Sequence, residues 1–202
     1  DVQSDIARTI TDALHAEISP AEEALLGAVP TENTEALEKY LLGVHTWKRG
    51  SYSALQEAID YLTQATTLDP QYAEAWVALA AAYSSARQTG AMSAADYVRA
   101  AEPAVRRAMD VNPRLAPAHA QQASIQMALG DVDGAESSFK QALALDPNDS
   151  ATVAEYAFFL RDSFRAEEAV PLVEAALVND PLSTELLFQL GKAEMHAGRP
   201  ER

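Results

Sequence analysis

Apolar residues recur every three or four positions along most of the chain, which is the period of an α-helix with one buried face. The first such stretch covers residues 2–18, where Ile6, Ile10, Leu14 and Ile18 stand four positions apart. Similar stretches follow, separated by short breaks that contain Gly, Pro, Asn or Asp. Because these residues end helices and form turns, the pattern predicts an all-α protein built from many short helices.

The helical pattern repeats with a fixed length. Residues 116–149 hold two helical stretches around Gly130-Asp131, and a unit of the same length and pattern follows over 150–183. Small residues stand where the two helices must approach closely, namely Ala123, Ala135 and Ala142. Pro113, Pro147 and Pro181 close successive units at equal intervals. A period of about 34 residues predicts a helical solenoid, in which each unit buries its apolar face against its neighbours.

A second unit begins with AEAWVALAAAY, where Trp76, Leu79 and Tyr83 match the spacing W-x2-L-x3-Y and Ala80 replaces the usual glycine. On these residues the chain resembles the tetratricopeptide repeat (TPR) family. The resemblance implies a right-handed superhelix of antiparallel helix pairs that binds a protein or peptide.

We expect residues 1–35 to form an N-terminal helix and a linker, and residues 36–202 to form the TPR domain. The expected repeats are 36–72, 73–115, 116–149, 150–183 and a partial repeat at 184–202. We assign the extra length of the first repeat to the turn at Gly50-Ser51. The second repeat is longer through an insertion at 84–93, for which Ser93 and Asp96, a pair resembling a capping box, favour a loop centred on Gly90 over longer helices.

Charge restricts the class of partner. The chain carries 30 acidic and 15 basic residues, a net charge of −15. Nucleic acids and anionic membrane surfaces would be repelled. The acidic excess indicates either an ordinary solvated face or a partner with basic character. No apolar run is long enough to cross a bilayer, so we expect a soluble domain without direct membrane insertion.

The sequence contains no motif that indicates catalysis or the binding of a metal or cofactor. The chain has no cysteine, and its four histidines lack the paired spacing of metal ligands. His119 stands where the preceding repeat has Trp76, which favours a packing role. No phosphate-binding loop, nucleophile elbow or dinucleotide fingerprint occurs. We therefore expect no enzyme activity, no cofactor and no metal site.

The TPR resemblance implies that the first helix of each pair lines a concave groove. The residues that this places on the groove are Tyr40, Val44, Trp47, Val77, Ser124, Met127, Phe158, Arg161, Phe188 and Lys192. Such a surface suits an apolar helix or extended segment with a few charges. Two other interpretations remain: the helix at 2–18 covers Tyr40 and Trp47, or Phe158 and Phe188 pack on each other.

The resemblance argues against one known role. TPR domains that hold the acidic tails of chaperones use Lys, Asn and Arg to bind a carboxylate. Here the matching positions hold Tyr40, Val44, Ala78, Pro117 and Gln121, none of which is a cation.

Two alternatives to partner binding stay open. The last repeat lacks its second helix, which leaves Leu187, Leu190 and Met195 without cover and predicts a homodimer through this uncapped C-terminal helix. The other alternative is a small-ligand sensor that uses the groove between Trp47 and Phe188.

The linker Pro30-Thr31-Glu32-Asn33 resembles the junction between the TolB-like domain and the TPR repeats of a group of bacterial signalling proteins. That resemblance implies the regulatory or sensory part of a longer protein, such as a transcription regulator or a nucleotide cyclase. A start without Met agrees with a fragment. The compartment stays undecided between the cytoplasm and the periplasmic part of a single-pass membrane protein.

Overall fold

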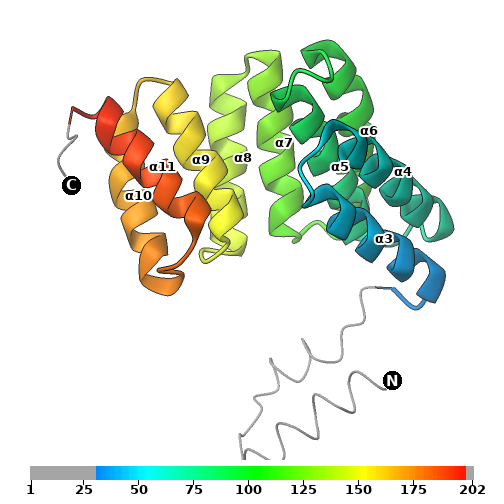
Figure 1. Ribbon diagram of the computed structural model, residues 1–202. Coiled ribbons are helices and arrows are strands. Elements are labelled where there is room, and N and C mark those ends of the chain that lie inside the picture. The colour runs from blue at the N-terminus through cyan, green and yellow to red at the C-terminus, as the bar shows by residue number, and fades with distance from the viewer. Residues whose placement is uncertain (1–30, 199–202) are drawn as a thin grey trace, which may run out of the picture.

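The computed structural model describes residues 31–198, which form nine α-helices and no strand (Figure 1). The helices are α3 (Thr34–Trp47), α4 (Tyr52–Leu68), α5 (Ala73–Gln88), α6 (Ala94–Val111), α7 (Ala116–Leu129), α8 (Val132–Leu145), α9 (Ser150–Asp162), α10 (Ala166–Asn179) and α11 (Thr184–His196). They pack as successive pairs, α3 with α4 through α9 with α10, and α11 covers α9 and α10. The predicted all-α solenoid of antiparallel helix pairs is confirmed. The helix expected at residues 2–18 lies outside the described residues.

The joints between repeats share one design. Each connects two helix pairs through four residues, of which the second is Pro70, Pro113, Pro147 or Pro181. Asp69, Asn112 and Asp146 open three of these joints. In each case the side-chain oxygen accepts a hydrogen bond from the backbone N–H two residues later, at 2.9 to 3.1 Å. The side chain thus forms the turn while the proline prevents the helix from continuing.

The turns inside the repeats need a left-handed residue. Gly50, Gly90, Gly130 and Gly198 have φ between 70° and 77°, a region that residues with a Cβ rarely adopt. Phe164 takes this position between α9 and α10, with φ of 60° and a side chain that is 99% exposed. It is the one non-glycine residue with positive φ among residues 31–198.

Small residues allow the helix pairs to touch. A Cβ on Gly43 of α3 would lie 2.7 Å from Leu62 Cγ of α4, closer than packed atoms can approach. Ala123, Ala135 and Ala142 are fully buried where α7 and α8 cross. Gly43 thus lies where α3 and α4 touch, as the sequence predicted, and the three alanines have the burial that a close approach of α7 and α8 requires.

The longer repeats are extended mainly in their helices. α4 has 17 residues against 14 in α8, so the turn at 48–51 holds only part of the excess in the first repeat. In the second repeat, residues 84–88 continue α5 and α6 reaches 18 residues, which confines the expected loop to 89–93. Ser93 caps α6, since its Oγ accepts from the backbone N–H of Asp96 at 3.1 Å and donates to the Asp96 carboxylate at 2.7 Å.

Residues 31–33 of the linker are part of the solenoid. Asn33 caps α3 by accepting from the backbone N–H groups of Glu35 and Ala36, and its Nδ2 donates to the carbonyl oxygen of Leu68 at 3.0 Å. The Thr31 hydroxyl donates to the Asp69 carboxylate. These bonds fix residues 31–33 to the end of α4.

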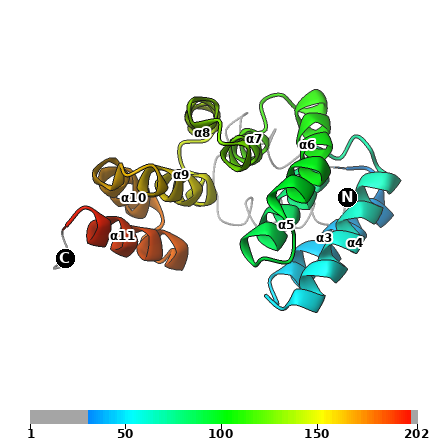
Figure 2. The same ribbon diagram turned by 90° about the horizontal axis from the view of Figure 1, so that it is seen from above.

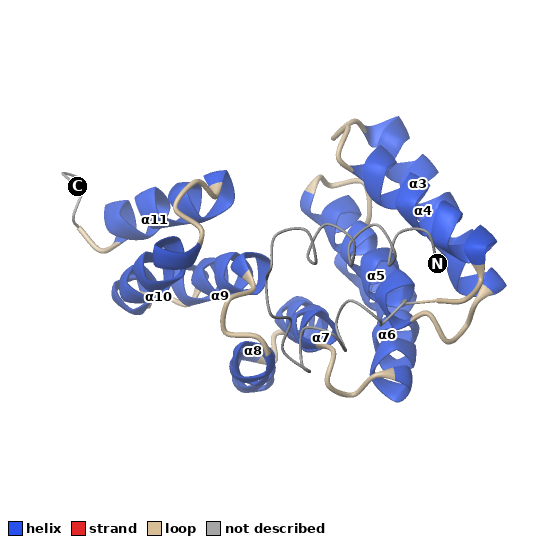
Figure 3. Cartoon of the chain, turned by 90° about the horizontal axis from the view of Figure 1, so that it is seen from below, coloured by secondary structure: helices blue, strands red, loops and turns tan. Residues whose placement is uncertain are grey.

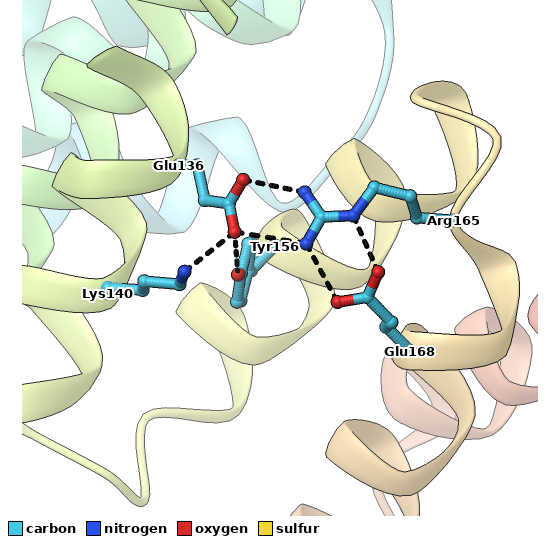
Figure 4. A network of polar contacts seen from close by, with 5 residues as sticks. All are labelled: Glu136, Lys140, Tyr156, Arg165 and Glu168. Atoms are coloured by element: carbon cyan, nitrogen blue, oxygen red, sulfur yellow. Dashed lines mark hydrogen bonds and ion pairs between the residues drawn. The ribbon is translucent and has the colours of Figure 1, made fainter. Parts of the chain in front are cut away.

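A polar network joins the third and fourth repeats (Figure 4). Glu136 of α8 accepts from Arg165 at 2.6 Å and pairs with Lys140 at 2.7 Å. Arg165, just before α10, also donates to Glu168. Tyr156 of α9 donates to Glu136, and its ring stacks 5.3 Å from Phe139. One carboxylate therefore connects three helices.

Candidate partner-binding groove

The helix pairs form a curved row, and the first helix of each pair faces the inner side of the curve. Seen from above, α5, α7 and α9 border the inner side of the curved row, while α6 and α8 lie on the outer side (Figure 2). The view from below shows the same curvature of the row (Figure 3).

One cavity of about 360 Å³ lies among these first helices. Its lining comes from the first helix of every described repeat, α3, α5, α7, α9 and α11, with one residue from α8. The lining residues are Trp47, Ser85, Arg87, Gln88, Ser124, Met127, Phe139, Ala154, Glu155, Phe158, Glu185 and Gln189. The volume is at the lower end of the range for ligand sites.

Four of the residues expected on the groove lie in this lining: Trp47, Ser124, Met127 and Phe158. Phe158 is 39% exposed, so a large apolar face meets solvent inside the cavity. Ser124 is buried and contributes its hydroxyl group.

Three other expected residues serve the core of the first two repeats. Val77 is 9% exposed and packs with Ala108 and Ala118. Tyr40 and Val44 are partly buried against the cluster around Leu62 and Leu79. The Tyr40 ring also lies 5.0 Å from that of Tyr72. Their sequence spacing suited the groove, but their packing places them outside its lining.

The remaining three belong to the C-terminal end of the row. Arg161 lies over the Phe158 ring at 4.9 Å and donates to Gln189 Oε1 at 2.9 Å, which connects α9 to α11. Lys192 lies over the Phe188 ring at 4.3 Å. Phe188 is 54% exposed and is not part of the lining of this cavity, which includes Trp47.

The sequence reasoning missed Glu155. Its Oε2 accepts from the Ser124 hydroxyl at 3.0 Å and its Oε1 from Gln121 Nε2 at 3.4 Å, so α9 is bonded to α7. The pKa of Glu155 is raised to about 7, mainly by burial; the nearby Asp149 and Glu185 charges also raise it, and these two hydrogen bonds lower it. A signal existed: Gln121, Glu155 and Gln189 are equally spaced, so three successive repeats place a polar residue at one register position.

His119 has the packing role that its position suggested. It is 3% exposed, and its Nε2 lies 2.9 Å from the carbonyl oxygen of Pro113. Trp76, its equivalent one repeat earlier, donates from Nε1 to the carbonyl oxygen of Pro70 at 3.1 Å. Among residues 31–198, no group of three His, Asp or Glu side chains is placed to hold a metal ion.

The residues expected to self-associate divide into two kinds. Leu190 is partly buried against the core, whereas Leu187 and Met195 are 49% and 69% exposed on α11. Within the described part of the chain, no helix has the length and apolarity that a membrane crossing requires.

Comparison with known proteins agrees with this geometry. The family model described as tetratricopeptide repeat matches residues 116–149. TTC0263, a thermophilic TPR protein from Thermus thermophilus, is 23% identical with a TM-score of 0.62, over 79% of this chain and 99% of its own.

Two other solved structures have the same fold at lower identity. MamA is 14% identical with a TM-score of 0.50, over 83% of this chain and 85% of its own. The assembly chaperone of RpL4 (Acl4) is 15% identical with a TM-score of 0.51, over 89% and 67%. No curated protein sequence matches the chain. The family match and these structural likenesses together show that the chain contains a tetratricopeptide repeat at residues 116–149 and folds as a TPR solenoid.

Proposed function

We propose that this protein is a non-catalytic protein–protein interaction scaffold whose inner groove holds a peptide segment of its partner. The observation that supports the proposal is the cavity to which the first helix of every described repeat contributes. A single segment lying there would contact five helices that are far apart in sequence.

The lining has the chemistry of a recognition surface. Trp47, Met127 and Phe158 provide apolar area, and Arg87 and Glu185 provide charges of both signs. Aromatic anchors within a polar rim are typical of the residues that dominate binding energy at interfaces.

The linker supports the finer proposal that the scaffold is the regulatory or sensory part of a larger bacterial signalling protein. Thr31 and Asn33 bond to Asp69 and to the Leu68 carbonyl oxygen. A domain that precedes such a linker would be held in a defined position relative to α4, as transmission of a binding signal requires.

Selection of peptides on the purified protein tests the scaffold role. Peptides displayed on phage and enriched on the wild-type protein should bind Phe158→Ala at least tenfold more weakly, because truncating a central aromatic anchor commonly costs about 1.4 kcal/mol or more. Val178→Ala is the matched control, since Val178 is 80% exposed on the outer helix α10. Equal binding to wild type and Phe158→Ala would exclude the groove as the binding site.

Self-association is the second candidate, and the exposure of Leu187 and Met195 favours it. Sedimentation of the wild-type protein should then show a mass that rises with concentration, and Leu187→Glu with Met195→Glu should remove the rise. Leu190→Glu is a poor test because Leu190 packs on the core. A monomer at every concentration would eliminate this candidate.

A further inference from the structure

We propose that the groove recognises a basic side chain, and that a lysine or arginine of the partner binds beside Glu155. The inference rests on the proposed function, because it names the partner chemistry at the same groove.

Glu155 is a carboxylate with more acceptor capacity than its neighbours satisfy. Two donors reach it, the Ser124 hydroxyl at 3.0 Å and Gln121 Nε2 at 3.4 Å. A carboxylate has room for about four donors. The charges that act on it, Asp149 and Glu185, are both negative. A cation in the cavity would therefore relieve repulsion as well as supply donors.

Gln121 provides an independent observation at the same place. Its side chain is 5% exposed and is held against Glu155 through Nε2, while its Oε1 is buried and receives no hydrogen bond. A buried acceptor without a donor is uncommon in folded proteins. A Lys ammonium offers three donors and an Arg guanidinium five, and neither carries an acceptor. Glu155, which lines the cavity, and Gln121 Oε1, which is buried beside Glu155 behind the lining, together offer acceptors for that donor set.

The cavity also suits the aliphatic part of a basic side chain. Trp47, Met127 and Phe158 line it beside Glu155, so the methylene groups of Lys or Arg would lie on apolar surface. Glu185 lines the same cavity from α11. The net charge of −15 would attract such a partner from a distance.

Among residues 31–198, two arginines line the cavity or contact its lining, and each has an aromatic partner. Arg161 lies over the Phe158 ring and donates to Gln189. Arg87 lines the cavity with its guanidinium 5.3 Å from the centre of the Tyr97 ring. The buried Nε of Arg87 donates no hydrogen bond. Arg87 is therefore the residue that would compete with the partner's cation for Glu155.

Titration of the full chain with amino-acid amides, followed by NMR, tests the proposal directly. The probes are N-acetyl-arginine methylamide and N-acetyl-lysine methylamide, with N-acetyl-norleucine methylamide as the uncharged control. We expect the cationic probes alone to shift the Gln121 side-chain amide and the Ser124 backbone amide in a saturable way. Glu155→Gln should weaken this binding about tenfold or more, since it removes a charge-assisted hydrogen bond.

Asp60→Asn is the matched control variant, because it removes one exposed carboxylate from the outer helix α4. It should leave the titration unchanged. An equal response to the norleucine probe, or equal binding by Glu155→Gln, would overturn the proposal. Binding that appears only in Arg87→Gln would also overturn it, because Arg87 would then occupy the site.

Peptide selection separates this proposal from the scaffold role. If the selected peptides bind more weakly to Phe158→Ala and yet show no enrichment of Lys or Arg, that result would contradict the basic-residue proposal and would still support the scaffold role. Peptides enriched in Lys or Arg that lose affinity for Glu155→Gln would support both. If no selected peptide depends on Phe158, the scaffold role itself fails.

Discussion

At the scale of single residues, Glu155 and Phe164 are held in environments that disfavour them. Glu155 keeps an ionisable group in the groove wall beside Asp149 and Glu185. Phe164 has a left-handed backbone that the other repeats give to glycine. Residues of this kind concentrate at functional sites, where strain is retained for a purpose. Both are also open to simple tests.

The stability of the protein should fall as the pH rises from about 4.5 to about 7. Burial raises the pKa of Glu155 from 4.5 to about 7, so the folded state binds a proton more tightly than the unfolded chain. Unfolding therefore releases that proton in this window, and the ionised form costs the folded state up to roughly 3 kcal/mol above it. Urea unfolding of wild type and Glu155→Gln at pH 5 and pH 8 measures the effect.

The variant should lose most of the decrease, since glutamine does not titrate. A decrease of equal size in the variant would assign it to another group. Binding of a cationic peptide should become tighter across the same window, because the ionised carboxylate is the form that accepts it.

Phe164→Gly should stabilise the protein by about 0.5–1 kcal/mol. A residue with a Cβ in the left-handed region costs about 1–2 kcal/mol, and part of the gain is lost to the greater freedom of glycine in the unfolded chain. No packing is sacrificed, because the side chain is 99% exposed. Thermal unfolding measures the change. Gly130→Ala, at the equivalent turn, should destabilise instead, and a stabilising effect there would contradict the explanation.

At the scale of elements, each helix pair depends on small residues at its crossing and on a proline at its end. The two requirements act together, because a fixed joint holds the helices at the distance that alanine or glycine allows. Gly43 shows how close that distance is, with room for no Cβ against Leu62.

Ala142→Leu should cost about 1–3 kcal/mol by overpacking the contact of α7 and α8. Ala142 is fully buried at this crossing. Ala144→Leu is the matched control, since Ala144 is exposed on the same helix and leucine has nearly the same helix propensity. Chemical denaturation of both variants measures the difference. Equal stability of the two would show that the crossing is loosely packed.

At the scale of the whole molecule, the width of the groove depends on how the third and fourth repeats are held together. The groove lining comes from both sides of that junction, with Met127 on α7 and Phe158 on α9. Gln121 and Ser124 of α7 donate hydrogen bonds to Glu155 of α9. Glu136 of α8 accepts hydrogen bonds from Tyr156 of α9 and from Arg165, which precedes α10. The curvature of the row and the shape of the site are thus set by the same contacts.

Arg165→Met should loosen this junction. The substitution removes the cation that pairs with Glu136; the Arg165 side chain is 33% exposed and that of Glu136 is 18% exposed. We therefore expect the free energy of unfolding to fall by about 1–2 kcal/mol, which is less than for a fully buried pair. We also expect a broader distance distribution in small-angle scattering. Arg106→Met is the control, because Arg106 forms an ion pair within α6 and is 70% exposed. No change relative to that control would exclude the network as a determinant of shape.

The sequence determined the elements and their order, because those depend on local chemistry that recurs in each repeat. Prolines after Asp or Asn marked the joints, and buried alanines marked the crossings. The spacing also placed Trp47, Ser124, Met127 and Phe158 on one groove. It favoured a loop over longer helices at 84–93, but capping by Ser93 fits both, and residues 84–88 continue α5.

The tertiary structure alone decided which residues of the inner helices stay accessible and which charges meet. Val77 has the right helical position but is covered by Ala108 and Ala118 from neighbouring helices. Glu155 reads as an ordinary helix residue until α7 brings Gln121 and Ser124 against it and α11 adds Glu185. Burial and electrostatic environment arise from contacts between repeats, and these depend on the curvature of the whole row.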